Sequence, residues 1–491
     1  MRTTIIKYSP FLLLALWLLL QLSFLKADPD GSINYNSRDV WTDEGLNTSQ
    51  VRNYVNHYGY DIGECDNLVK TPLFSFSLIP GFELFGTHLW VSRLFVLLFT
   101  CLVISVFLKN THLKHLGLLM LLICFTQFHI FQYSHYGMAQ MYGIDFILLS
   151  LFFLYKYSQT SNPNPKTSNL FLSVMFSSFA WYAKIQFIYV LIIIPVTLFF
   201  YARKDYTDAG KNKYRVLFIS LGFTCSFVLF YFLAWYFPNR EVYNFILADE
   251  SAGRLNLATN LFLRAKHHIE NAIWIGTLKL YAIALAGALC FLFILWKKIT
   301  KQYFIVLLFV IVWWLTELHN LLFVQLPMRY LLSLIFSTSF LIAFIMFLFY
   351  ETGKVAQYII SCSTIIIVAV NLFFLYHGFN ERTYSIANIN EYIARTTFGE
   401  SPVLGNWGPA LAWDSRAKVT PVSSEYIPDK PRLNHFHPKL IIMEAGEEDS
   451  NHTDKTQSVN IRELADSSRT FHVGQYNVVL YWMKKEIYAK D

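Results

Sequence analysis

Charged residues are scarce in this sequence. Asp, Glu, Lys and Arg make up 15% of the 491 residues, whereas 55% are hydrophobic and 18% aromatic. An average soluble domain carries about 25% charged residues, so a soluble chain of this length would need more polar surface. This composition excludes a soluble multidomain enzyme, a disordered protein and a coiled coil. It indicates a polytopic helical membrane protein.

Cysteine and metal-binding patterns are sparse as well. Of six cysteines, only Cys65 lies in a clearly polar loop. The sequence has no Cys-x-x-Cys pair and no His-Glu-x-x-His motif, which excludes a disulfide scaffold and the common zinc sites. It also has no internal repeats and no Lys/Arg block interleaved with stacking aromatics, so the net charge of +7 does not indicate nucleic-acid binding.

Long apolar runs are abundant in the first 376 residues. About eleven of them approach the ~20 residues that a helix needs to cross a bilayer. The predicted spans are 9–25, 88–108, 115–134, 143–157, 169–183, 185–202, 216–237, 272–295, 302–320, 330–350 and 355–376. The first is expected to be a retained anchor, because its apolar core is long for a cleaved signal peptide.

The loops between these spans alternate in character. One set is short and basic, and the positive-inside rule places it in the cytoplasm together with the N-terminus. The opposite set contains the long loops 26–87 and 238–271 and the C-terminal segment 377–491. We therefore expect these three segments outside a plasma or inner membrane.

The C-terminal segment has the charge content of a soluble domain. Strands are expected at 401–405, 439–443 and 476–482, and a short helix is expected over 384–397. The predicted fold class is an all-α polytopic membrane domain over 1–376, followed by a small extracytoplasmic α/β domain over 377–491.

Two adjacent carboxylates follow the first span, in Trp41-Thr42-Asp43-Glu44-Gly45. Such a pair suits a general base, or an oxygen site for a divalent cation such as Mg²⁺ or Mn²⁺. In the alternative interpretation, Asp43 and Glu44 cap a helix that begins at Gly45, where carboxylates complement the helix dipole. Residue types alone favour this alternative.

Further motifs follow in a fixed order: Lys70-Thr-Pro-Leu, Phe85-Gly, a helix carrying Arg93, Tyr133-Ser-His-Tyr-Gly-Met-Ala-Gln-Met-Tyr142, Trp181-Tyr-Ala-Lys184 and Pro327-Met-Arg329-Tyr330. Together with the anchor and Asp43-Glu44, this order resembles the GT-C glycosyltransferases. It is most similar to the branch of protein mannosyltransferases (family 39) and bacterial lipid A aminoarabinose transferases. Gln140 stands where that branch commonly has arginine.

The resemblance implies transfer of a sugar from a polyprenyl-phosphate donor to a lipid, glycan or protein hydroxyl at the outer face, usually with inversion. Asp43 matches the catalytic carboxylate, and Glu44 would support it or help to hold a divalent cation. Lys70 matches a lysine near the lipid phosphate, and Arg329 or Lys184 would share that task.

Each cationic residue also has a simpler interpretation. Arg93 would snorkel to the headgroups or pair with Glu83. Lys184 would be an interfacial anchor, and Arg329 would pair with Glu317 across a short outer loop. For Lys70 the simpler interpretation is a loop residue.

Arg93 is also a possible substrate contact, and the other candidates for that role are weaker. The segment 258–270 could form an amphipathic helix carrying Arg264 and His267, either as a lid over the phosphate site or as a plain surface helix. Tyr142 and Asp145 lie early in the fourth span, where a carboxylate also suits a helix N-terminus.

Two other functions remain open at this point. A multi-pass lipid or solute transporter, or flippase, would more often show repeated halves and charges near the bilayer midplane. Here the ionisable residues of the membrane part collect on one side, which favours an enzyme acting on a membrane-bound donor. A pseudoenzyme that keeps the fold without transfer would differ only in activity.

Overall fold

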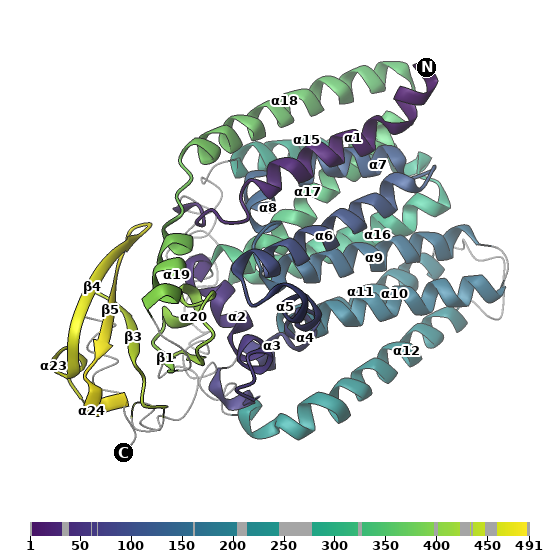
Figure 1. Ribbon diagram of the computed structural model, residues 1–491. Coiled ribbons are helices and arrows are strands. Elements are labelled where there is room, and N and C mark those ends of the chain that lie inside the picture. The colour runs from purple at the N-terminus through teal and green to yellow at the C-terminus, as the bar shows by residue number, and fades with distance from the viewer. Residues whose placement is uncertain are drawn as a thin grey trace.

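The computed structural model (Figure 1) shows a bundle of long helices with a small sheet beyond one end of it. The described residues are 2–31, 39–59, 61–65, 67–160, 163–203, 214–244, 277–322, 327–396, 401–422, 433, 436–446 and 459–488. The N-terminus lies at the far end of the bundle from the sheet, and the C-terminus lies beside the sheet.

The bundle helices coincide with the predicted spans. Within the described part of the chain, eight helical stretches are long and apolar enough to cross a membrane, judged by length and composition. They are Leu89–Lys109 (α6), Ala139–Gln159 (α9), Ile185–Arg203 (η4 and α11), Arg215–Asn244 (beginning with α12), Leu278–Leu295 (α15), Lys301–Leu321 (beginning with α16), Met328–Tyr350 (α17) and Lys354–Thr396 (beginning with α18). The prediction of an integral, all-α membrane part is confirmed.

Three predicted spans correspond to helices outside this set. They are α1 (Arg2–Leu22), the broken segment α7 (Lys114–Leu119), η3 (Met120–Cys124) and α8 (Phe128–Tyr133), and α10 (Pro163–Ala183). The span expected at 115–134 is interrupted at Gln127, whose side chain accepts a hydrogen bond from Ile130 N at 2.9 Å and so begins a new helix. A polar cap inside an apolar run is hard to see from hydropathy alone.

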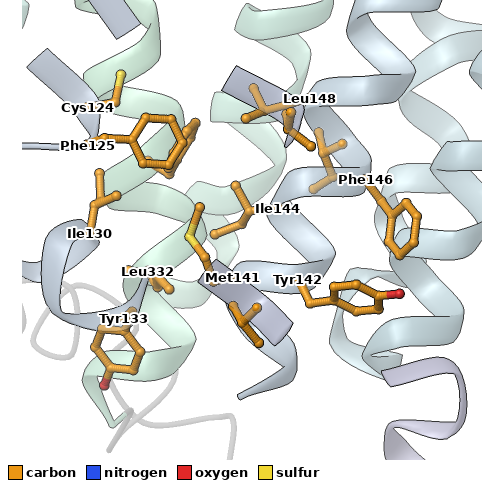
Figure 2. Packing of buried hydrophobic residues seen from close by; sticks show 14 of the residues in the cluster. Cys124, Phe125, Ile130, Tyr133, Met141, Tyr142, Ile144, Phe146, Leu148 and Leu332 are labelled. Atoms are coloured by element: carbon orange, nitrogen blue, oxygen red, sulfur yellow. The ribbon is translucent and has the colours of Figure 1, made fainter. Parts of the chain in front are cut away.

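Helices α9 and α17 lie at the centre of the bundle. Figure 2 shows Met141 and Ile144 of α9 on the side facing α17, while Tyr142 and Phe146 point the other way. Leu332 of α17 is fully buried in the same cluster. Both helices are buried on nearly all sides, as expected for helices surrounded by other helices.

The first outer loop is helical. It contains α2 (Asp39–Val55), α3 (Asn67–Lys70), α4 (Pro72–Ser77) and α5 (Ile79–Phe85). Because α2 begins at Asp39, the expectation that Asp43 and Glu44 cap a helix starting at Gly45 is wrong. Both carboxylates lie within the second turn of α2. Of the second long loop, 238–271, the structure describes only the part up to Asn244.

The C-terminal unit, defined as the described residues from Ser385 to Tyr488, contains helix α19 (Ser385–Thr396) and a five-stranded sheet of order β2-β1-β3-β5-β4. The strands are β1 (Val403–Leu404), β2 (Val419–Thr420), β3 (Leu440–Glu444), β4 (Ala465–Val473) and β5 (Tyr476–Met483). Strand β1 pairs in parallel with β2 and β3, whereas β5 pairs antiparallel with β3 and β4.

The expected helix and the three expected strands of this unit are confirmed. Strands β2 and β4 were not predicted, and in β4 most of the side chains are polar and exposed, which hides the alternating pattern of a strand. The last bundle helix α18 (Lys354–Asn380) runs past the expected end at 376. The domain boundary at 376/377 stays a prediction.

Candidate active site

Four of the predicted site residues meet at the end of the bundle that faces the C-terminal unit. They come from distant elements: Asp43 from α2, Lys70 from the end of α3, Lys184 from the residue between α10 and η4 (Ile185–Tyr189), and Arg329 from the first turn of α17. Arg329 Nη1 lies 2.6 Å from Asp43 Oδ2. Lys184 is close enough to interact electrostatically with the other three. We call these four residues the charged cluster.

Lys70 is positioned through its backbone neighbours. The Val69 carbonyl accepts hydrogen bonds from Tyr243 Oη at 2.8 Å and from Trp235 Nε1 at 3.3 Å. Leu68 N donates to Gln50 Oε1 of α2 at 3.1 Å. Helix α3 is therefore held between α2 and the segment that follows α12 (Arg215–Tyr231). These contacts fix the backbone position from which the side chain of Lys70 extends.

Lys184 is buried, with 5% of its surface exposed. Burial lowers the pKa of its ammonium group, because the charged form loses water. Tyr330 and Asp43 oppose this effect on the pKa, while Arg329 and Lys70 add to it by repulsion. A buried lysine beside two other cations creates a positive potential, which favours the binding of an anion at this point.

Arg329 does not form the ion pair with Glu317 that its simpler interpretation predicts. It pairs with Asp43, whereas Glu317 accepts hydrogen bonds from Asn320 at 2.7 Å and from Trp313 Nε1 at 3.3 Å, as well as from Tyr189. The interpretation that pairs Arg329 with Glu317 is therefore wrong.

Tyr330 is a member of this site that the sequence argument did not single out. It interacts electrostatically with Lys184, and the Arg329 guanidinium lies 4.9 Å from its ring centroid. The signal was present in the motif Pro327-Met-Arg329-Tyr330, but a tyrosine in an aromatic-rich membrane protein does not stand out.

Glu44 faces away from the charged cluster and forms a buried ion pair with Arg93. Arg93 Nη2 lies 2.5 Å from Glu44 Oε2, and Arg93 Nε lies 2.9 Å from Glu44 Oε1. Gly137 N also donates to Glu44 Oε1, at 2.6 Å.

Arg93 Nη1 donates to the carbonyls of Phe24, Leu25 and Ala27 after α1. Arg93 thus pairs with Glu44 and neither snorkels nor pairs with Glu83.

The arrangement of the two carboxylates bears on the expected divalent cation. Both oxygens of Glu44 are occupied by Arg93 and Gly137, and Oδ2 of Asp43 is paired with Arg329. Among the described residues, no group of three or more His, Cys, Asp and Glu side chains could hold a metal ion. These residues do not fit a divalent-cation site, so the cation stays a prediction from the resemblance.

The weaker candidates lie elsewhere. Tyr142 is buried and packs against Phe99 with ring centroids 4.8 Å apart. Asp145 is buried and accepts a hydrogen bond from Thr100 at 2.6 Å.

Three further residues complete the comparison with the sequence. Gln140, which stands in place of an arginine, is fully buried, and its amide has no hydrogen-bond partner among the described residues. Arg264 and His267 lie outside the described residues, so their roles stay predictions.

The fold of the chain is shared with proteins of known structure. No protein-family model matches the chain, and no curated protein matches its sequence. Among solved structures, the chain is similar to ArnT from Cupriavidus metallidurans bound to undecaprenyl phosphate, with a TM-score of 0.59 and 14% identity over 96% of this chain and 97% of that one.

A second similar structure is the archaeal oligosaccharyltransferase AglB from Archaeoglobus fulgidus, in complex with an inhibitory peptide and a dolichol-phosphate. Its TM-score is 0.51, with 10% identity over 89% of this chain and 69% of that one. ArnT and AglB are both GT-C glycosyltransferases. The GT-C fold predicted from the sequence motifs is therefore confirmed, while membership of the family 39 branch stays a prediction.

Proposed function

We propose that this protein is an integral-membrane glycosyltransferase that moves a sugar from a polyprenyl-phosphate donor to an acceptor hydroxyl on a lipid, glycan or protein. The observation that carries the proposal is the charged cluster, in which Asp43 lies beside Lys70, Lys184 and Arg329 at one end of the bundle. A carboxylate among three cations provides a base next to a phosphate site. The fold is shared with ArnT, whose structure holds undecaprenyl phosphate, and this likeness supports a polyprenyl-phosphate donor.

In the proposed reaction, Asp43 accepts the proton of the acceptor hydroxyl. The hydroxyl oxygen forms a bond to the anomeric carbon while the bond from that carbon to the phosphate oxygen breaks. The electron pair of the breaking bond leaves with the polyprenyl phosphate. A single displacement of this kind inverts the anomeric configuration.

The cationic residues act on the leaving group. Its phosphate gains negative charge as the bond breaks, so fixed cations stabilise the transition state more than the ground state. Lys70 and Lys184 supply point charges, whereas the planar guanidinium of Arg329 can bind phosphate through two N–H groups and also orient Asp43. Tyr330 supplies a hydroxyl beside these groups.

The sidedness of the protein follows from the loop charges. The charged cluster lies at the end of the bundle that carries the C-terminal unit, opposite the N-terminus. The short basic loops place the N-terminus in the cytoplasm. We therefore propose that transfer occurs at the extracytoplasmic face of a plasma or inner membrane in the cell envelope.

A direct test uses membranes that contain the expressed protein. They are incubated with radiolabelled undecaprenyl-phosphate mannose or undecaprenyl-phosphate aminoarabinose, and label is followed into lipid, glycan and protein fractions. The proposal expects transfer into one of these fractions. Movement of labelled donor across vesicles without any transfer would instead support a transporter and contradict the proposal.

Replacing Lys70 with alanine is expected to weaken binding of undecaprenyl phosphate by roughly 10- to 100-fold, the effect of losing one hydrogen bond to a charged group. Binding is measured by titrating the purified protein with the lipid. Lys114, the first residue of α7 and outside the charged cluster, provides the matched control as Lys114→Ala. Equal affinities of the two variants would remove Lys70 from the phosphate site.

Lys184 gives donor binding a pH dependence. Its pKa is lowered by burial, so the ammonium group loses its proton at a lower pH than an exposed lysine. Affinity for undecaprenyl phosphate should therefore fall as the pH rises through this lowered pKa. A Lys184→Arg variant keeps its charge and should bind with little change over the same range. A wild-type affinity that is flat up to the pKa of an ordinary lysine would contradict this prediction.

A further inference from the structure

Helix α2 has two functional sides. One side carries Asp43 and Glu44, which contact Arg329 and Arg93 of the bundle. The other side packs against the C-terminal unit, chiefly against the short helix α20 (Gly408–Leu411). Figure 1 shows α2 between the bundle and α20. The helix that carries the proposed base is therefore held from both sides.

The closest approach occurs at Gly45, directly after the two carboxylates. A Cβ atom at this position would lie 2.3 Å from Pro409 C and 2.4 Å from Ala410 N. These are backbone atoms of α20, which cannot rotate away as the end of a side chain can. Any side chain at position 45 would therefore push α2 and α20 apart.

Two buried polar residues fasten the rest of α2 to the same unit. Arg52 Nη2 donates to the Pro409 carbonyl at 2.6 Å, and its guanidinium lies 3.9 Å from the ring centroid of Trp413. Asn53 donates to Val419 O at 2.9 Å and accepts from Val419 N at 3.0 Å, so its amide pairs with the outer edge of strand β2. Both side chains are almost fully buried.

A third contact lies just before the carboxylates. The turn between β4 and β5 approaches the Trp41 ring so closely that a Cβ at Gly474 would lie 2.5 Å from Trp41 Cζ2. The C-terminal unit thus touches α2 through three separate stretches, around 409–413, at Val419 and at Gly474. These contacts bracket Asp43 and extend over most of the helix.

We infer that the C-terminal unit is a positioning element for the catalytic helix, and that Gly45 and Arg52 are the residues through which it holds Asp43 in the charged cluster. The inference rests on the proposed function. Lys184 and Arg329, which would bind the donor phosphate, are carried by other elements, and Lys70 is held by the segment after α12 as well as by Gln50 of α2. Loosening the contact should therefore lower turnover and spare donor binding.

The test replaces Gly45 with alanine in the full-length protein. We expect kcat to fall by about 10²-fold, the effect of a base displaced by roughly 1 Å, with the affinity for undecaprenyl phosphate and the KM for the donor changed less than threefold. Arg52→Lys keeps the positive charge but loses the planar contact with Trp413 and the hydrogen-bond geometry to Pro409, and should show a smaller fall in kcat of the same kind.

Two matched controls separate positioning from general effects. Gly222→Ala makes the same change inside α12, where a Cβ would meet no atom of the described residues within 4 Å. His88→Ala removes the 2.6 Å pair with Asp414, which ties the C-terminal unit to the start of α6. Both controls should keep wild-type kcat.

Each outcome decides one point. Wild-type kcat in Gly45→Ala and Arg52→Lys would overturn the inference, and so would a loss of undecaprenyl phosphate binding or of folded protein in both variants, since these residues would then serve stability alone. Absence of sugar transfer by the wild type and by Gly222→Ala would instead overturn the proposed function.

Discussion

Replacing Asp43 with asparagine is expected to lower sugar transfer by about 10²–10⁴-fold, the usual contribution of a positioned general base. Asparagine has nearly the same shape and keeps an oxygen near Arg329, but it cannot accept the proton of the acceptor hydroxyl. Binding of undecaprenyl phosphate should not weaken, because Lys70, Lys184 and Arg329 are unchanged. The measurement is the transfer rate at saturating donor, together with a lipid titration.

The control for this variant is Asp414→Asn. It makes the same chemical change at an acidic residue of the C-terminal unit, which pairs with His88 outside the charged cluster. Transfer by Asp43→Asn within tenfold of the rate of Asp414→Asn would show that Asp43 is not the base. Loss of undecaprenyl phosphate binding by Asp43→Asn would show that this carboxylate helps to build the phosphate site.

The membrane architecture was predictable because it depends on local composition. Apolar runs of bilayer length mark helices wherever they occur, and the basic loops between them alternate without reference to distant residues. The helix over Ser385–Thr396 and strands β3 and β5 were visible for the same reason, since their hydrophobic patterns lie within a few consecutive residues.

The charged cluster was predictable through motif order rather than through physics alone. Residue types indicated cations at Lys70, Lys184 and Arg329, but nothing local to these positions shows that they meet at Asp43. The separation of the two carboxylates was not predictable either. Adjacent residues of a helix point about 100° apart, so once α2 begins at Asp39, Asp43 and Glu44 must face different partners.

The contacts of α2 with the C-terminal unit could not be predicted, because they join residues that lie far apart in the chain. The hydrogen bond from Arg52 to Pro409 is an example, with a separation of 357 residues. Gly45 gave no signal in the sequence, since a glycine inside a helix is only expected to weaken it. A glycine is needed at this position because the backbone of α20 lies against it. A single sequence does not show that α20 lies next to α2.

Replacing Arg93 with methionine is expected to destabilise the protein by about 3–5 kcal/mol, the cost of leaving one member of a buried ion pair without its partner. Glu44 is buried and receives both Nε and Nη2 of Arg93, so its carboxylate would keep only the hydrogen bond from Gly137 N. The carbonyls of Leu25 and Ala27 would also lose the donor Arg93, while the Phe24 carbonyl would keep the hydrogen bond from Ala27 N. The measurement is the free energy of unfolding from denaturant titration in detergent micelles.

The double variant Glu44→Gln with Arg93→Met separates the ion pair from the loss of the donor to these carbonyls. It leaves no buried charge, and the amide oxygen of the introduced glutamine can still accept the hydrogen bond from Gly137 N, so a large part of the lost stability should return. If Arg93→Met alone cost less than about 1 kcal/mol, the range of exposed ion pairs, water would have to reach Glu44. In that case packing alone would join α2 and α6 to the end of α1. Glu44 would then be accessible for a catalytic role beside Asp43.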